Sequence, residues 1–184
     1  MGLKRLLAAV VLAAMHVTGA MADPMTLDDF GNGAAGRWRF FADTVMGGVS
    51  TGKVEFVNEK GVTFARMSGA VSTANNGGFI QFRTDLAGRA PEGAQGVRLV
   101  ARGNGERYFV HLRTAAMLLP WQYYQAGFST GPGWREVRLP FSSFKPSGRG
   151  LAASPDPISL RSIAIVAFGR DHEARVEVRQ VGFF

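Results

Sequence analysis

The feature that most restricts the fold of this chain is an alternation of apolar and polar residues with a period of two. After residue 22, no stretch shows the apolar period of a helix. Glycine, proline and asparagine separate the alternating segments, as expected for short strands joined by turns. The apolar members are Ile80 and Phe82; Val97, Leu99 and Ala101; Tyr108, Val110 and Leu112; Val137 and Leu139; and Val176 and Val178. The pattern predicts an all-β protein.

One segment is apolar without alternation. Residues 162–168 read Ser-Ile-Ala-Ile-Val-Ala-Phe, which predicts a central strand covered on both faces. Of the 24 glycines, 22 follow residue 22, about twice the usual frequency of roughly 7%, and this favours many turns. Residues 148–157, rich in glycine, serine and proline, are predicted to form a long loop. Together these features predict a jelly-roll β-sandwich of two antiparallel sheets.

The first 22 residues have the layout of an export signal. Lys4 and Arg5 precede an apolar run of 10 residues, 6–15, and Ala20-Met21-Ala22 has the small-x-small form of a cleavage site. The run is shorter than the roughly 20 residues of a membrane-spanning helix. A mitochondrial presequence would be amphipathic and rich in arginine and serine, and this segment is neither. We therefore expect a signal peptide over 1–22, a single domain over 23–184 without a transmembrane segment, and a periplasmic or secreted location.

The chain contains no cysteine, which restricts its chemistry. Disulfides, thiol catalysis, cysteine-based metal sites and a lipid on an N-terminal cysteine are all excluded. The formal charge of +7 falls to +5 when Lys4 and Arg5 leave with the signal. A basic surface suits anionic lipid headgroups, acidic glycans or an acidic protein face, although charges scattered over solvent-facing strand positions explain it equally well. Without a dense basic stripe, nucleic acid is not an expected partner.

Four segments resemble the complex I intermediate-associated protein 30 family. They are Trp38 with the run Asp43 to Ser50; Asn75 to Phe79; Arg102 to Tyr108; and Trp134 with Pro140 to Pro146. The similarity extends over 27–184. It implies a galactose-binding-like sandwich, an architecture also found in many carbohydrate-binding modules. Mitochondrial members help to assemble NADH:ubiquinone oxidoreductase, and the family offers no catalytic residues to transfer.

The resemblance therefore implies a non-enzymatic binding or assembly protein of the cell envelope, with a membrane respiratory complex among its candidate partners. The alternative is a carbohydrate-binding module for envelope glycans. An export signal would place the protein on the opposite side of the membrane from the compartment that corresponds to the mitochondrial matrix, so partners on the outer face of a membrane complex are the ones to consider.

The two glycine doublets are predicted to shape loops, because glycine adopts positive φ without a steric penalty. Asn76-Gly77 predicts a hairpin turn. We expect the two loops to meet and to brace each other through side-chain hydrogen bonds to the backbone. The residues assigned to this structural role are Trp38, Asp43, Met46, Gly47, Gly48, Ser50, Asn75, Asn76, Gly77, Gly78 and Phe79.

A candidate binding surface follows from the outward positions of two predicted strands. Gln81 and Arg83 share one face of their strand, and His111 and Arg113 share one face of another. Trp121, Tyr123 and Tyr124 add aromatic rings nearby in the sequence. Aromatic faces with a few fixed donors recognise sugar rings, and they also occur at protein-interaction hot spots. The residues predicted to bind a ligand or partner are Gln81, Arg83, His111, Arg113, Trp121 and Tyr123.

Two motifs match enzyme signatures without the structural context that those signatures need. Gly48-Val49-Ser50-Thr51-Gly52 has the G-x-S-x-G form of a serine hydrolase, but an alternating strand follows Ser50 where a helix is required. A hydrolase using Ser50 is the most remote alternative. Residues 31–36 match G-x-G-x-x-G, but strand-like residues follow them, so no nicotinamide cofactor is expected.

Metal and cofactor chemistry has little support in the sequence. His111 and His172 are the imidazoles that remain after residue 22. We expect no cofactor and no transition-metal site. Calcium is the metal for which candidate ligands exist, namely Asp28, Asp29 and Asp43, although acids near turns commonly act as turn formers.

Overall fold

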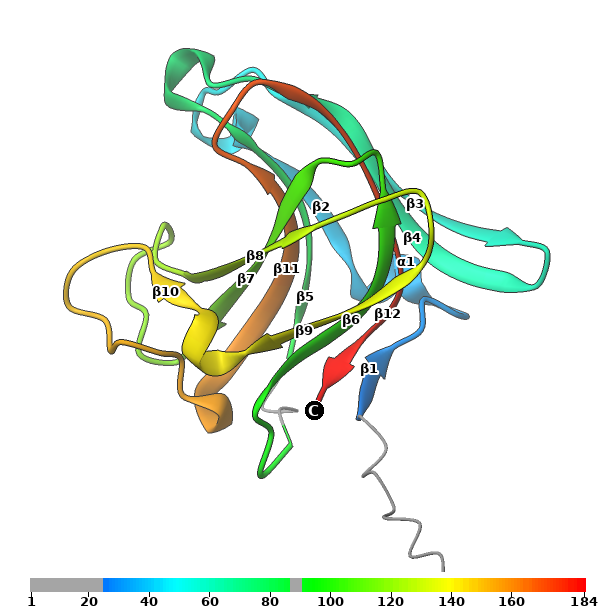
Figure 1. Ribbon diagram of the computed structural model, residues 1–184. Coiled ribbons are helices and arrows are strands. Elements are labelled where there is room, and N and C mark those ends of the chain that lie inside the picture. The colour runs from blue at the N-terminus through cyan, green and yellow to red at the C-terminus, as the bar shows by residue number, and fades with distance from the viewer. Residues whose placement is uncertain (1–24, 87–90) are drawn as a thin grey trace, which may run out of the picture.

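The computed structural model describes residues 25–86 and 91–184; the predicted signal segment 1–22 lies outside these residues. Two six-stranded sheets face each other, and all pairings within them are antiparallel (Figure 1). In spatial order the first, which we call the back sheet, contains β3 (Thr51–Glu59), β4 (Val62–Val71), β12 (His172–Phe183), β6 (Gly96–Gly103) and β9 (Arg135–Pro140), and β1 (Thr26–Asp28) pairs with the end of β12. The second, the front sheet, contains β10 (Lys145–Pro146), β8 (Tyr124–Ser129), β7 (Arg107–Thr114), β11 (Leu160–Phe168), β5 (Phe79–Asp85) and β2 (Arg39–Ala42). The prediction of an all-β sandwich is confirmed.

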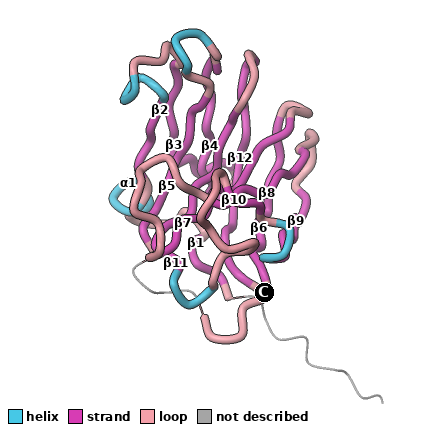
Figure 2. Tube along the Cα trace, turned by 90° about the vertical axis from the view of Figure 1, so that its left-hand side faces the viewer, coloured by secondary structure: helices cyan, strands magenta, loops and turns pink. Residues whose placement is uncertain are grey.

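Helical structure among the described residues is limited to short segments beside the strands (Figure 2). They are α1 (Ala34–Arg37) and the 3-10 turns η1 (Asp43–Met46), η2 (Ala74–Asn76), η3 (Phe141–Ser143) and η4 (Pro157–Ser159). The loop predicted over 148–157 joins β10 to η4. None of these helices has the length and hydrophobicity of a membrane span.

The core lies between the sheets, where the inward residues of each strand meet. The predicted alternation places apolar side chains on one face of β5, β6, β7, β9 and β12, as the sequence indicates. Trp38, Phe82, Phe30 and Tyr108 are among the large side chains that fill this core. The Trp38 ring lies 5.3 Å from both the Phe30 and Phe82 rings. Burial of aromatic side chains on this scale makes the hydrophobic effect the main stabilising contribution in a chain without disulfides.

Strand β11 is central, as its apolar run predicts, but the reason for that run differs from the expected one. β11 lies between β7 and β5, and Ile163 and Ile165 point into the core. On the opposite face, Ser162, Ala164 and Val166 are buried although no second layer covers them, because they form the floor of a pocket. The apolar character of the second face therefore marks a pocket floor.

The predicted hairpin turn at Asn76-Gly77 is wrong in position and in type. The two residues with left-handed backbone are Asn75 (φ 56°) and Asn76 (φ 59°), one position earlier, and Gly77 is extended. The segment connects β4 of the back sheet to β5 of the front sheet, so the flanking strands do not pair with each other as a hairpin requires. Asparagine tolerates the left-handed region, which explains the shift.

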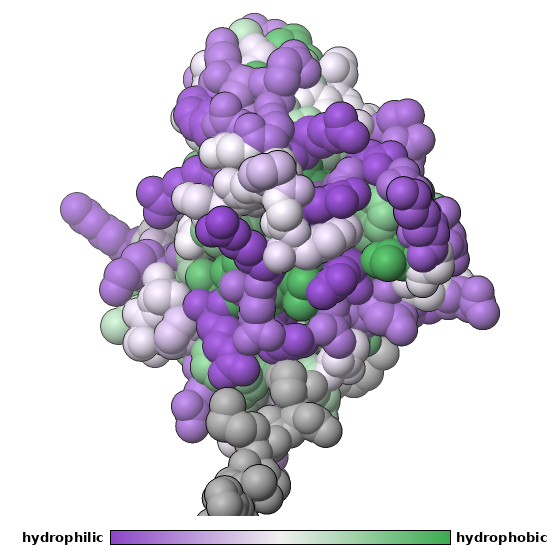
Figure 3. All heavy atoms as spheres, turned by 45° about the vertical axis from the view of Figure 1, so that its right-hand side comes forward, coloured by the Kyte–Doolittle hydropathy of each residue, from purple (hydrophilic) through white to green (hydrophobic). Residues whose placement is uncertain are grey.

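The outer face of the back sheet carries most of its charge in ion pairs. Glu177 is buried there, and Arg66 donates to it at 2.7 Å, Arg102 also donates to it, and Arg175 lies at 3.8 Å. The Arg102 guanidinium lies 4.5 Å from the centroid of the Trp134 ring. Figure 3, which brings the β3 and β4 side of the molecule forward, shows mainly hydrophilic side chains with small hydrophobic areas among them.

Candidate functional site

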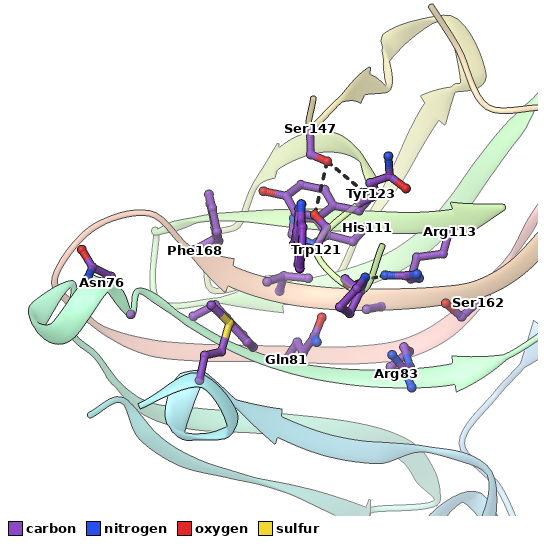
Figure 4. Close-up of a pocket in the computed structure, with 17 residues that line it drawn as sticks. Asn76, Gln81, Arg83, His111, Arg113, Trp121, Tyr123, Ser147, Ser162 and Phe168 are labelled. Atoms are coloured by element: carbon purple, nitrogen blue, oxygen red, sulfur yellow. Dashed lines mark hydrogen bonds between the residues drawn. The ribbon is translucent and has the colours of Figure 1, made fainter. Parts of the chain in front are cut away.

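A pocket of about 350 Å³ lies on the outer face of the front sheet (Figure 4). All six residues predicted to bind a ligand line it, although they come from β5, β7 and the segment between β7 and β8. The complete lining is Met46, Asn76, Gly77, Phe79, Gln81, Arg83, His111, Arg113, Pro120, Trp121, Gln122, Tyr123, Ser147, Ser162, Ala164, Val166 and Phe168. The structure therefore brings the predicted residues together, while their role in binding stays a prediction.

Strand register explains how these residues meet. Ala164 on β11 pairs with Arg83 on one side and with His111 on the other. Ser162, two residues earlier, pairs with Arg113. Residues two apart on a strand share a face, so the long side chains of β5 and β7 stand on either side of a floor of small residues.

Aromatic rings form one wall of the pocket. The Tyr123 ring stacks on the imidazole of His111 with a centroid distance of 4.0 Å and an interplanar angle of 7°. The Phe168 ring is steeply inclined to both, with centroid distances of 5.7 Å to His111 and 6.2 Å to Tyr123. Trp121 is 65% exposed and lies over the pocket, which leaves much of its ring free for a ligand (Figure 4). Tyr124, the next aromatic residue, points instead into the core.

Hydrogen bonds hold the segment that carries Trp121. Arg113 donates to the carbonyl oxygen of Pro120 and, at 3.1 Å, to that of Leu119. Gln122 Oε1 accepts from the backbone N–H of Leu119 at 3.1 Å. Ser147 Oγ accepts from the Tyr123 N–H at 3.0 Å and donates to the Trp121 carbonyl at 3.4 Å. The backbone that carries Trp121 and Tyr123 is thus held from both sides before any ligand arrives, which lowers the entropic cost of binding.

The positive charge of the pocket comes from the arginine side chains Arg83 and Arg113, and the histidine His111 does not contribute to it. Burial lowers the pKa of His111 to about 4, and Gln125 Oε1, 2.8 Å from Nε2, only partly opposes this effect. The imidazole is therefore neutral at pH 7. Burial also lowers the pKa of Arg113, and the nearby positive charge of Arg83 lowers it further. Among the described residues that line the pocket there is no aspartate or glutamate.

The two glycine-doublet loops meet at the buried carboxylate of Asp43. Ser50 donates to it from its N–H at 2.9 Å and from its hydroxyl at 2.5 Å. From the start of β5, the strand next to β2 in the front sheet, Gly78 N–H donates at 2.6 Å and Phe79 N–H at 3.2 Å. Burial raises the pKa of the Asp43 carboxyl, but these hydrogen bonds together bring it below its ordinary value. One carboxylate thus connects the loop after β2 to the loop before β5.

Close packing around Asp43 explains glycine at two positions in these loops. A Cβ at Gly48 would lie 2.3 Å from Asp43 Cγ, and one at Gly77 would lie 2.4 Å from Asp43 Oδ2. Met46, Asn76, Gly77 and Phe79 also line the pocket, so the loops form part of its wall as well as bracing each other. Nothing in the sequence indicated this second role.

Ser50 is placed as a structural residue and lacks the surroundings of a nucleophile. It is 1% exposed, its hydroxyl donates to Asp43, and the same oxygen accepts from Ser72 N–H at 3.0 Å. Strand β3 follows it directly. A hydroxyl that is buried and hydrogen-bonded on both sides cannot reach a substrate, so the hydrolase alternative loses its candidate residue. Residues 31–36 include the first three residues of α1, and this four-residue helix, which follows the three-residue strand β1, is too short to build a dinucleotide site.

The three carboxylates considered for calcium are engaged separately. Asp28 accepts from Arg37 Nε at 2.8 Å and from Trp38 Nε1 at 2.9 Å, which ties the core tryptophan to an ion pair. Asp29 accepts from the Gly31 N–H at 2.9 Å, and Asp43 holds the loops described above. Within residues 25–86 and 91–184, no three His, Cys, Asp or Glu side chains gather as metal ligands would.

Several residues that line the pocket were not predicted from the sequence to do so. Ser162, Ala164, Val166 and Phe168 occupy alternate positions of the apolar run, and the same period that revealed the other strands would have placed them on one face. For Ser147, which reaches the pocket from the segment after β10, no sequence signal existed.

Solved structures with this fold include carbohydrate-binding modules. A family 11 module from Clostridium thermocellum, solved in complex with a β-1,3-1,4-mixed-linked tetrasaccharide, superposes with a TM-score of 0.69 at 14% identity and covers 87% of this chain and 94% of its own. The family 11 module of the cellulase Lic26A-Cel5E from the same organism has a TM-score of 0.70 at 14% identity and covers 88% of this chain and 94% of its own. A family 30 module of the cellulase Cel9D-Cel44B, also from Clostridium thermocellum, has a TM-score of 0.51 at 14% identity and covers 73% of this chain and 82% of its own. At this identity the likeness concerns the fold alone.

Sequence comparison identifies the family. No curated protein matches the chain significantly. The family described as Complex I intermediate-associated protein 30 matches over residues 29–178, which includes both loops joined by Asp43 and the whole pocket lining. The chain belongs to the Complex I intermediate-associated protein 30 family.

Proposed function

We propose that this chain is a non-catalytic binding protein whose front-sheet pocket holds a saccharide. The observation that carries the proposal is the combination of an exposed Trp121, on a segment held by hydrogen bonds, with the stacked pair His111 and Tyr123 above a floor of small residues. Aromatic faces pack against the C–H faces of sugar rings, and Gln81 and Arg83 are available to bind hydroxyl groups. The fold shared with a family 11 module that holds a tetrasaccharide supports this reading.

The lining also supports binding rather than hydrolysis. Glycoside hydrolysis commonly uses two carboxylates on either side of the scissile bond. The described lining residues include none, and His111 is neutral and bonded to Gln125. Such a pocket can hold and orient a sugar without a group to protonate its leaving oxygen.

The proposal is tested by removing the most exposed ring of the pocket. In native gels containing soluble neutral or acidic polysaccharides, at least one polysaccharide is expected to retard the wild-type protein. Trp121→Ala should weaken that affinity about tenfold or more, since loss of a ring contact of about 1.4 kcal/mol corresponds to a factor of ten. Leu118→Ala is the matched control, because Leu118 is 90% exposed on the same segment and lies outside the pocket lining.

Two results would contradict saccharide binding at this site. One is that no polysaccharide in the panel alters the mobility of the wild-type protein. The other is equal retardation of wild type and Trp121→Ala, which would place the binding elsewhere on the surface.

The family match favours a second candidate function, assembly of a membrane complex through a protein partner. On the back sheet, Arg175 is exposed and Arg102 lies beside Trp134, a composition that suits a protein interface. Affinity purification of the tagged protein from solubilised membranes should then retrieve respiratory subunits. Repeated purifications without such subunits would remove this candidate.

We infer a periplasmic or secreted location from the export-like segment over 1–22. Fractionation of cells that express the full chain should yield the shortened protein outside the cytoplasm. The uncleaved protein in the cytosol would contradict this inference, and it would also favour glycans or partners of that compartment.

A further inference from the structure

One end of the pocket concentrates positive charge. Arg83, Arg113 and Ser162 lie together at the end away from Asn76 and Phe168 (Figure 4). The two arginines stand on opposite sides of β11, since Arg83 pairs with Ala164 and Arg113 pairs with Ser162. Both arginines line the pocket, and the small side chains of Ala164 and Ser162 form part of its floor on the strand between them.

Neither guanidinium is paired with an acid in the described part of the chain. The Arg83 guanidinium lies 4.7 Å from the centroid of the Phe41 ring and makes no hydrogen bond or ion pair with a described residue. Arg113 donates only to the backbone carbonyls of Leu119 and Pro120. Asp85, two residues after Arg83 on β5, pairs with Ser162 across from Arg113, but it is exposed and lies outside the pocket lining.

On the back sheet, by contrast, partly buried arginines form ion pairs with glutamates. Arg66 and Arg102 both pair with Glu177, and Arg98 pairs with Glu136 at 2.8 Å. Two neighbouring cations repel each other, and the positive charge of Arg83 adds to the effect of burial in lowering the pKa of Arg113. An anion between them would relieve this repulsion, and the planar guanidinium fork matches a carboxylate in shape.

We propose that the pocket takes an acidic saccharide, with a uronic acid ring packed on Trp121 and Tyr123 and its carboxylate bound between Arg83 and Arg113. This inference rests on the proposed saccharide-binding function and specifies the class of sugar. The arginine pair supplies the charge recognition, and the aromatic wall supplies the contact with the ring.

Calorimetry with matched ligands tests the inference. Short oligogalacturonates and oligomannuronates are each compared with their methyl esters, which keep the sugar ring but lack the charge. The measurements use physiological ionic strength, where the Debye length is about 8 Å and distant charges contribute little. For at least one of the two sugars, the acid is expected to bind wild type at least tenfold more tightly than its ester. Arg83→Gln should remove most of this preference.

Arg135→Gln is the matched control, because it removes the same charge from an exposed position on β9 of the back sheet. It should retain the preference for the acid. If Arg83→Gln and Arg135→Gln lose the preference for the acid equally, the preference comes only from long-range attraction between the basic protein and the acidic sugar, and the inference is overturned.

Other outcomes separate the inference from the proposed function. Equal affinity for acid and ester, with loss of both in Trp121→Ala, would overturn the acidic-sugar inference and leave saccharide binding intact. Binding of sulfated galactan oligosaccharides without binding of either uronate would overturn the assignment of a carboxylate. Failure of every saccharide, neutral or acidic, would overturn both proposals.

Discussion

Asp43→Ala is expected to lower the free energy of unfolding by about 3–5 kcal/mol. The Asp43 side chain is fully buried, and alanine would leave the N–H groups of Ser50, Gly78 and Phe79 without their acceptor. Each buried donor that loses its partner costs about 1–3 kcal/mol, and water cannot easily replace the carboxylate in this tightly packed site. The substitution would also separate two loops that hold part of the pocket wall.

Denaturant unfolding of wild type and variant measures this loss, and Asp29→Ala is the control. Asp29 is exposed and accepts one hydrogen bond, from Gly31, so its loss should cost less than about 1 kcal/mol. Similar losses in both variants, or a loss below about 1 kcal/mol for Asp43→Ala, would show that Asp43 does not hold the loops together.

Acidification between pH 6.5 and pH 4 is expected to destabilise the protein by about 3 kcal/mol through His111. The buried imidazole has a pKa of about 4 in the folded protein and an ordinary value of 6.5. Because the unfolded chain binds a proton in this interval and the folded chain does not, stability falls as the pH falls from 6.5 to 4 and this contribution then levels off. Tyr123, Phe168 and Gln125 surround the imidazole, and none of them carries a charge that would compensate.

Two measurements check the His111 prediction. The imidazole proton resonance should titrate with a midpoint near pH 4, and His111→Phe should flatten the stability profile between pH 4 and 6.5. The carboxyls of Asp28, Asp43 and Glu177 have pKa values below their ordinary ones, so their protonation destabilises the fold at lower pH. A midpoint near 6.5 would mean that His111 is hydrated, contrary to a stacked and dry aromatic wall.

The sequence specified the sandwich because strand alternation is a local property. Val176 and Val178 had to share a face, as did His111 and Arg113, whatever their partners were. Register and sheet order are non-local, and they alone place Arg83 and Arg113 on the two strands that flank β11, two residues apart in register. The candidate residues could therefore be named from sequence, whereas their convergence in one pocket could not be derived from it.

The features that the sequence predicted wrongly or missed also have specific structural causes. Asn76-Gly77 has the composition of a hairpin turn, but the chain passes there from one sheet to the other, and local composition does not report that crossing. The second apolar face of residues 162–168 covers no further layer, because a pocket floor excludes water in the same way as a packed sheet. For Ser147, contact with the backbone at Tyr123 depends entirely on tertiary structure.

Mapping of amide chemical shifts during saccharide titration tests the central claim most directly. The labelled protein would be titrated with mixed-linkage β-glucan oligosaccharides and with oligogalacturonates and oligomannuronates. Saccharide binding in the front-sheet pocket predicts shift changes concentrated in β5, β7 and residues 118–123 with at least one of these ligands. Changes confined to β4, β6 and β12 of the back sheet, or none with any ligand, would contradict it.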